Sequence, residues 1–315
     1  MTPHLGDEPG RLPYADERQL STEGRFVRQR RRASSAEIGG DHAPGRRGRD
    51  ITRSLRIALL HLAPELGALD ANRALIEYGT RVAAGFGADW VVSGELVVPG
   101  YRFAPVLGTE WINEQPDKWM RRLARLSGDL GVVSFVSHPD RDAASGRLFN
   151  TLFVIRRDGR LLGRQRKLHP TPESEGWAST GQLSRPVLVD GIHVGLLVCA
   201  DVYTAQPALR LRDDGAQLLL STAAWWPGDW GPDGEWEART LDTGLPMIVC
   251  NRTGRDGGSD LVDAESVIVD RGVKLVRLRS PDSTVFVVDC LIRDDHVASC
   301  EVMAAVSLTS ALRVR

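Results

Sequence analysis

The sequence lacks the features that mark membrane proteins and nucleic-acid-binding proteins. No apolar run in its 315 residues approaches the roughly 18 that a transmembrane helix needs. The 40 basic and 41 acidic residues nearly cancel, giving a formal net charge of -1, so no general affinity for nucleic acid or for membranes is expected. A composition of 42% hydrophobic and 26% charged residues is instead typical of a globular protein.

Cysteine is scarce, and the motifs that bind phosphate are missing. The four cysteines are too few and too scattered for a disulfide framework or a CxxC-type zinc site, and they indicate a reducing, cytoplasmic setting: Cys199, Cys250, Cys290 and Cys300. No GxGxxG follows the first expected strand, and no GxxxxGK[ST] occurs. The usual cradles for dinucleotides and nucleoside triphosphates are therefore absent.

Lysine is rarer still, with three lysines beside 37 arginines. A lysine that is kept for its chemistry must be Lys118, Lys167 or Lys274.

The first 53 residues differ from the rest of the chain. They carry eleven arginines and eight acidic residues among Gly, Pro and Ser, without an apolar stripe, which predicts a disordered tail. They also lack the apolar core of a secretory signal. We expect one folded domain over residues 54–292 and a C-terminal extension over 293–315.

From residue 55 onward, short apolar runs alternate with amphipathic stretches, which predicts an α/β fold. Asp158-Gly159 and Asp190-Gly191 each separate two apolar runs and favour tight hairpin turns. Because some strands join as hairpins and others through helices, we expect two mixed sheets between helical layers. The expected strands are 55–62, 90–96, 132–138, 148–155, 161–168, 187–189, 194–199, 217–222, 247–251, 266–269 and 284–288. The expected helices are 71–86, 117–130, 205–213 and 235–242.

Three polar residues stand where apolar strands end: Glu95, Lys167 and Cys199. Strand ends in α/β sheets are where reacting groups are commonly placed, because the sheet fixes the backbone while the loops leave room for a substrate. A thiol beside a carboxylate and an ammonium group is suited to nucleophilic attack on a carbonyl carbon.

The segments around these residues resemble the nitrilase superfamily of carbon-nitrogen hydrolases. The resemblance runs from about residue 55 to 288 and rests on three motifs in order: GELVVPGY at 94–101, RKLH at 166–169 and LVCAD at 197–201. Gly215-Ala216, Trp226-Pro227 and the segment VCNRTG at 249–254 reinforce it. The resemblance implies an αββα sandwich of two mixed sheets and a Glu-Lys-Cys catalytic triad made of Glu95, Lys167 and Cys199.

The triad implies acyl transfer through a thioester. Glu95 takes the thiol proton, Cys199 adds to the carbonyl carbon, and Lys167 with the backbone N–H of Ala200 stabilises the oxyanion. The family usually adds a second glutamate between the lysine and the cysteine. Glu173 matches that position best, and Glu175 is the alternative.

Residues near the expected nucleophile bear on the substrate. Cys199-Ala200-Asp201 resembles the pattern of amidases and carbamoylases rather than that of nitrilases, although Asp201 is also well placed as a helix cap. Trp225 and Trp226 are candidate substrate-binding residues, with simple packing as the alternative. Tyr101 is a further candidate, with a loop residue that has no role in binding as the alternative. The expected substrate is a small amide or N-carbamoyl compound, with no metal, nucleotide or organic cofactor.

The sequence also departs from the family pattern near these motifs. Gly94 replaces the common proline, and Ala205-Gln206 replaces a frequent Pro-Glu pair, which indicates a divergent branch. A nitrilase, an amide-forming acyltransferase and a catalytically inactive interaction scaffold on the same fold therefore stay as alternatives. The resemblance further implies a homodimer or larger homo-oligomer, formed through the helix after Cys199 and the helix around Trp236.

Overall fold

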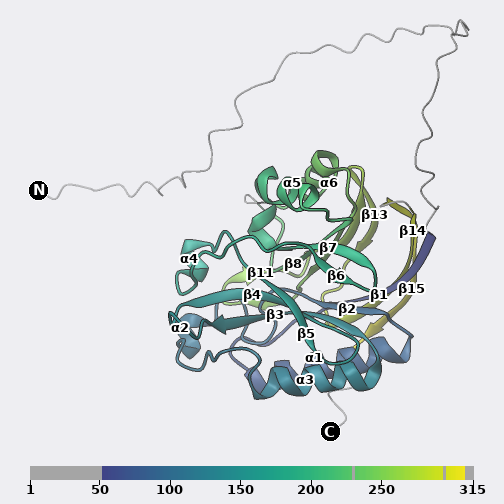
Figure 1. Ribbon diagram of the computed structural model, residues 1–315. Helices are drawn as coiled ribbons and strands as arrows, with labels where there is room; N and C mark the ends of the chain where they lie inside the picture. The colour runs from purple at the N-terminus through teal and green to yellow at the C-terminus, as the bar shows by residue number, and fades with distance from the viewer. Residues whose placement is uncertain (1–51, 229–230, 294–295, 309–315) are drawn as a thin grey trace, which may run out of the picture. The chain divides into compact units, whose positions relative to one another are not determined.

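The structure, a computed structural model, describes residues 52–228, 231–293 and 296–308. The expected tail over residues 1–53 lies almost wholly outside the described residues. Two mixed sheets face each other between two layers of helices, as Figure 1 shows. The predicted αββα sandwich is confirmed.

The larger sheet has seven strands and the smaller one six. The order in the larger sheet is β15 (His296–Ser307), β14 (Thr284–Arg293), β1 (Thr52–His61), β2 (Trp90–Ser93), β3 (Val133–Arg141), β4 (Leu148–Ile155) and β5 (Leu161–Arg166). The order in the smaller sheet is β13 (Val273–Leu278), β12 (Ser266–Asp270), β9 (Met247–Asn251), β8 (Leu218–Ala223), β7 (Ile192–Val198) and β6 (Val187–Val189). A separate pair is formed by β10 (Arg255–Asp256) and β11 (Ser259–Asp260).

Both faces of the larger sheet are buried along its central strands, and the alternation of side chains along β1 shows how. Ile57 and Leu59 lie in the core between the two sheets, whereas Ala58 and Leu60 pack under the helices α1 (Leu69–Gly85) and α3 (Lys118–Leu130). Successive side chains of a strand point to opposite faces, so a continuous apolar run is what such a strand requires. The outer face of the smaller sheet is covered by α5 (Ala205–Asp213) and α6 (Glu235–Thr243), as Figure 1 shows.

The two Asp-Gly turns form the hairpins that the sequence predicts. β4 pairs antiparallel with β5 across Gly159, and β6 pairs antiparallel with β7 across Asp190-Gly191. Asp190 and Gly191 have φ of 47° and 80°, as a two-residue turn between twisted strands requires.

The strands β13 and β15 were not expected from the sequence. Both are edge strands, and most of their side chains are exposed or half-buried. The segment expected as a C-terminal extension, 293–315, thus contributes a strand to the larger sheet in its described part.

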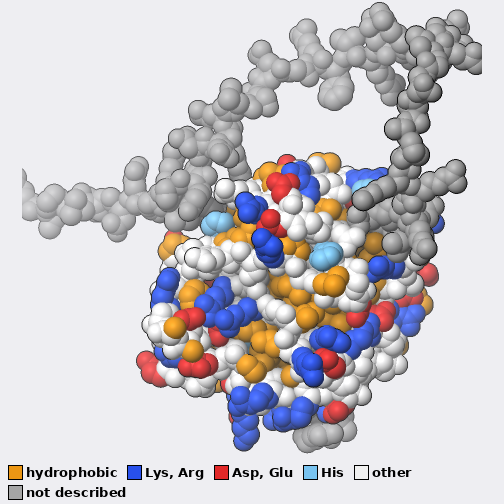
Figure 2. Space-filling view, viewed as in Figure 1, with side chains coloured by type: hydrophobic (Ala, Val, Ile, Leu, Met, Phe, Trp, Pro, Cys, Tyr) orange, Lys and Arg blue, Asp and Glu red, His pale blue; other side chains and the backbone are white. Residues whose placement is uncertain are grey.

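The remaining short elements are α2 (Ala104–Leu107), α4 (Pro172–Glu175) and the 3-10 turn η1 (Cys199–Val202). Within the described residues, no helix is long and apolar enough to cross a membrane. On the face drawn in Figure 2, basic and acidic side chains are interspersed with hydrophobic ones.

Candidate active site

Three strand ends bring the expected polar residues together. Glu95 follows β2 and Lys167 follows β5 in the larger sheet, while Cys199 follows β7 in the smaller sheet. The cluster therefore lies where the two sheets of the sandwich meet at one end, with each side chain held by a strand of fixed register.

Lys167 sits between two carboxylates. Its Nζ is 2.7 Å from Oε1 of Glu95 and 2.5 Å from Oε2 of Glu175, and all three side chains are fully buried. Asn150, in β4, donates from Nδ2 to Oε1 of Glu95 and to Oε1 of Glu175, each at 2.7 Å. A buried ammonium with this many hydrogen-bonded partners is stable only as a network, since losing one member would leave an unpaired buried charge.

The structure corrects the position of the second glutamate from Glu173 to Glu175. Both residues lie on α4, where two positions differ by about 200° around the helix axis. Glu175 faces inward and is buried, whereas Glu173 is exposed to solvent. Pro172 begins this turn, and the backbone N–H of Thr171 donates to Oε2 of Glu175.

We expect Glu175→Gln to lower kcat by about 10²-fold, because it loosens the lysine that faces Glu95. The charge of Glu175 also raises the pKa of Glu95, so its removal should move the acid limb of the pH profile of kcat/KM to lower pH. Glu173→Gln is the matched control and should change neither kcat nor the position of the acid limb. Equal effects of the two substitutions, or an unmoved acid limb, would contradict the placement.

Cys199 occupies a strained turn. Its φ is +47°, a conformation that few residues other than glycine adopt, at the junction of β7 and η1. Asp201 holds this turn: Oδ2 accepts from the backbone N–H of Val198, and Oδ1 accepts from those of Leu168 and His169. Asp201 thus fastens the loop after Lys167 to the turn that presents Cys199. It does not cap the next helix, as the sequence suggested, because the N-cap of α5 is Thr204.

Burial sets the protonation states of the cluster. Burial and the charge of Glu95 raise the pKa of the Cys199 thiol well above its usual range, against the opposing effect of Lys167. Burial also raises the pKa of Glu95, although Lys167 lowers it. For Lys167, burial alone would lower the pKa, but the carboxylates of Glu175 and Glu95 outweigh it and raise the pKa well above its usual range. At neutral pH the cysteine is therefore a thiol and the lysine is charged.

Tyr101 belongs to this charged cluster. It is 3% exposed, its hydroxyl donates to Oε2 of Glu175 at 3.0 Å, and its ring centroid lies 5.6 Å from Nζ of Lys167. The backbone N–H of Tyr101 donates to the carboxylate of Asp256. Tyr101 therefore orients the glutamate and the lysine, and Trp226, half-buried, packs edge-on against its ring.

The loop after β8 supplies backbone groups to the site. Ala224 donates its N–H to Oε2 of Glu95 at 3.0 Å. Trp225 is buried, and Asn251 brackets its backbone by accepting from its N–H and donating to its carbonyl. Its ring packs against Tyr203 and Trp236, with centroid distances of 4.8 and 5.7 Å. Ala200, next to the cysteine, is buried as well.

Sequence reasoning missed Asn150 and Asp256. Asn150 had a signal, because it is a polar residue inside the apolar run LFNTLFVI, and an amide in a fully buried strand must have hydrogen-bond partners. No sequence signal pointed to Asp256. It accepts a hydrogen bond from the backbone N–H of Tyr101, which lies 155 residues away in the sequence.

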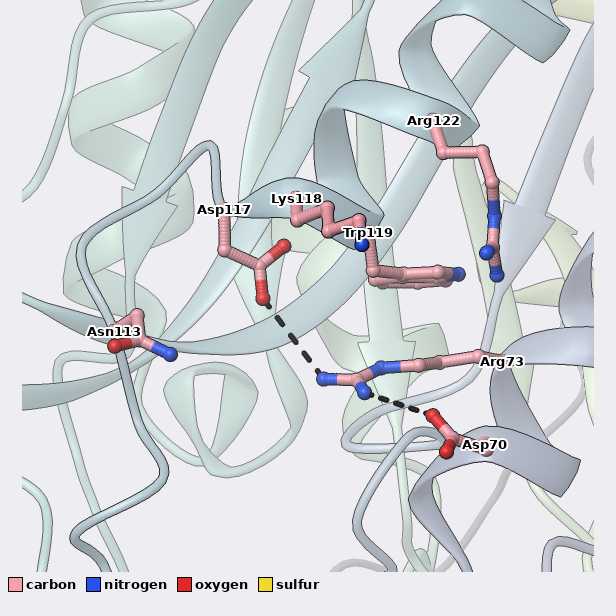
Figure 3. Close-up of a pocket in the computed structure, with 7 residues that line it drawn as sticks. All are labelled: Asp70, Arg73, Asn113, Asp117, Lys118, Trp119 and Arg122. Carbon is pink, nitrogen blue, oxygen red and sulfur yellow. Dashed lines mark hydrogen bonds and ion pairs between the residues drawn. The ribbon is translucent and has the colours of Figure 1, made fainter.

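A surface cavity of about 320 Å³ lies elsewhere, against the helices α1 and α3 (Figure 3). Three of its charged groups pair with one another: the guanidinium of Arg73 reaches Asp70 at 3.1 Å and Asp117 at 3.8 Å. Among the described residues, no group of three or more His, Cys, Asp or Glu side chains is arranged to hold a metal ion.

The chain is similar to known proteins over most of its described residues. A model of the carbon-nitrogen hydrolase family matches residues 56–291. The chain is 26% identical over 235 residues to the glutamine-dependent NAD(+) synthetase of Thermotoga maritima, covering 70% of this chain and 40% of that protein. It is 25% identical over 227 residues to a Pseudomonas protegens protein named hydrolase in pqqF 5' region, covering 71% of this chain and 76% of that one. The chain thus spans about two fifths of the length of the first of these relatives.

Among solved structures, a mutant amidase from Nesterenkonia sp. AN1 matches with a TM-score of 0.67 at 26% identity. The match covers 76% of this chain and 91% of that one. That structure shows the acetamide moiety of fluoroacetamide added covalently at the active-site cysteine of the amidase.

Proposed function

The chain belongs to the carbon-nitrogen hydrolase family, and we propose that it hydrolyses a small amide or N-carbamoyl compound through a thioester on Cys199. One observation carries the proposal: the Cys199 thiol, in a strained turn, lies near enough to the buried Glu95 carboxylate for the charge of Glu95 to raise the pKa of the thiol. An ammonium group and a side-chain amide both donate to Oε1 of that carboxylate. This is the arrangement of a nucleophile, a general base and a group that orients the base.

In the first step Glu95 acts as general base. Because the resting cysteine is a thiol, its proton must move to the Glu95 carboxylate as Sγ bonds to the carbonyl carbon of the substrate. The raised pKa of Glu95 favours this transfer, and Lys167 and Asn150 keep Oε1 in place. The C=O π electrons become the negative charge of an oxyanion.

Lys167 and the backbone N–H of Ala200 are the proposed donors to that oxyanion. Removing one such donor in other enzymes costs roughly 10²- to 10³-fold in kcat. The positive φ of Cys199 turns the following peptide unit, so the strain at the nucleophile also sets the direction of the Ala200 N–H.

Collapse of the tetrahedral species completes the cycle. The C–N bond breaks, Glu95 returns its proton to the leaving nitrogen, and ammonia or an amine departs. Glu95, again a carboxylate, then takes a proton from a water molecule that attacks the thioester, and the thiol re-forms as the acid leaves.

The walls of the site favour a small substrate. The catalytic side chains are buried, and the aromatic groups Tyr101, Trp225 and Trp226 stand beside them. The Nesterenkonia amidase, whose cysteine takes up an acetamide moiety, supports the same substrate size. We also propose that several copies of the chain assemble through α5 and α6. The side chains of Tyr203, before α5, and Leu241, on α6, are exposed and could form such a contact.

A matched substrate series tests the reaction class. The amides and nitriles of small carboxylic acids and the N-carbamoyl derivatives of small amino acids are offered to the full-length protein, and ammonia release is measured. We expect turnover of an amide or a carbamoyl compound, with an acyl adduct on Cys199 in the quenched protein by mass spectrometry. Faster turnover of the nitrile would show that the protein is a nitrilase instead. The absence of any adduct across the series would support a catalytically inactive scaffold.

A further inference from the structure

Two cysteines that are ten positions apart in the sequence face each other at the edge of the larger sheet. Cys290 in β14 and Cys300 in the edge strand β15 are directly opposite in the antiparallel register. Their Sγ atoms are 2.6 Å apart, and both are free thiols.

The backbone geometry at this position suits a disulfide. Directly opposed residues of an antiparallel pair have Cα atoms about 4.5–5.5 Å apart, which falls inside the ~4.4–6.8 Å that disulfides span. The two sulfur atoms are already closer than non-bonded sulfur atoms pack. A bond between them therefore requires no rearrangement of the strands.

One sulfur is accessible and the other is not. A surface cavity of about 400 Å³ is lined by both cysteines together with Ser54, Ser299 and Glu301. Cys290 is 2% exposed, whereas Cys300 is only partly buried. A small oxidant entering the cavity reaches Cys300 first.

We propose that Cys290 and Cys300 are a reversible redox pair, which a low-molecular-weight disulfide such as oxidised glutathione converts into a cross-strand disulfide. The Cys300 thiolate attacks one sulfur of the oxidant, which forms a mixed disulfide and releases one glutathione thiolate. Cys290 then attacks Sγ of Cys300 and displaces the second glutathione, which leaves with the Cys290 proton. Two protein thiols are oxidised, and one molecule of oxidised glutathione is reduced to two thiols.

The surroundings of Cys290 fit the second step of this order. Its hydrogen bond with Cys300 and its burial raise the pKa of its thiol, so it stays protonated while Cys300 makes the first attack.

The disulfide would fasten the edge strand without touching the active site. Cys290 pairs with Leu55 near the start of β1, whereas Ser93, the last residue of β2 before Glu95, pairs with Leu60 farther along β1. The cysteine pair is therefore displaced along the strands from the end that carries Glu95. Oxidation should raise stability and leave turnover unchanged.

The test compares the full-length protein after treatment with oxidised glutathione and after treatment with dithiothreitol. We expect the oxidised protein to have lost two hydrogens by intact mass and to show two of its four thiols by thiol titration in denaturant. A peptide map should join the segments holding Cys290 and Cys300. The closed loop is short, so the midpoint of thermal unfolding should rise by about 5 °C, reversibly on reduction.

Two variants separate the pair from the other thiols. Cys300→Ser should keep all three remaining thiols after oxidation and show no rise in melting temperature, whereas Cys250→Ser should still lose two thiols. Four thiols in the oxidised wild-type protein, a glutathione adduct that persists on Cys300, or a disulfide between two copies of the chain would each overturn the proposal.

Discussion

Cys199→Ala is expected to abolish turnover, with a loss in kcat of about 10⁴-fold or more. The substitution removes the only atom on which the acyl group can be carried, so no other member of the cluster can compensate. Cys199 is a small buried thiol, so its replacement by alanine should leave the fold intact. The measurement is ammonia release under single-turnover conditions, with circular dichroism to check folding.

Cys250→Ala provides the matched control for this experiment. Cys250 is a fully buried thiol at the end of β9, and its Sγ donates to the carbonyl of Val92 rather than to a carboxylate. The same chemical change there should lower stability and leave kcat near the wild-type value. Equal losses of kcat in the two variants would mean that Cys199→Ala acts through disturbed packing and not through loss of a nucleophile.

Alkylation distinguishes the two thiols by a second route. The pKa of each thiol is raised by burial, but only Cys199 has a carboxylate beside it to accept the proton. Iodoacetamide should therefore modify Cys199 much faster than Cys250, and Glu95→Gln should remove that difference. Equal rates in the wild-type protein would count against Glu95 as the base.

Lys167→Met is the second substitution with a large expected effect, and it should reduce both activity and stability. Loss of one partner from a buried ion pair leaves an uncompensated charge and costs about 3–5 kcal/mol. Here two carboxylates, Glu95 and Glu175, lose their common ammonium. We also expect kcat to fall by about 10³-fold, because the base loses its orientation and the oxyanion loses a donor.

The stability loss of Lys167→Met should depend on pH. Without the ammonium, burial raises the pKa of Glu95 further, so the folded variant binds a proton that its unfolded chain does not bind. A carboxylate with a raised pKa destabilises the fold above that pKa and ceases to do so as the pH falls below the pKa of the unfolded chain. Urea unfolding should therefore show a larger deficit at pH 8 than at pH 5.

Controls keep this prediction testable even if the single variant unfolds. Lys118→Met removes an exposed lysine from the start of α3 and should change neither kcat nor the free energy of unfolding. Lys167→Met combined with Glu175→Gln removes one of the two carboxylates and should recover part of the lost stability, though not the activity. A pH-independent deficit, or no recovery in the double variant, would contradict the buried charge network.

The sequence predicted much of the fold because apolar runs report burial directly. β4, β6, β9 and α5 have the expected boundaries, and the other expected helices begin and end within two residues of the predicted positions. β13 and β15 were not predicted in this way, because most of their side chains are exposed or half-buried and burial therefore shapes their sequences less than those of the core strands. Their pairing depends on the strands beside them.

The cluster around Lys167 shows the same division between what the sequence predicted and what it could not. The sequence identified Glu95, Lys167 and Cys199 through motifs that surround them and through the scarcity of lysine. It favoured Glu173 over Glu175, because spacing alone cannot tell which side of a four-residue helix faces a buried lysine. It also assigned Tyr101 to substrate, whereas the fold places its hydroxyl on Glu175.

By itself, then, the sequence determined the alternation of strands and helices and the residue types at three strand ends. Only the tertiary structure decided which glutamate meets the lysine, that Asn150 holds both carboxylates, and that Cys290 and Cys300 lie in contact. The reason is that local patterns record whether a side chain is buried, whereas its partner is chosen by strand register and sheet packing between segments far apart in the chain.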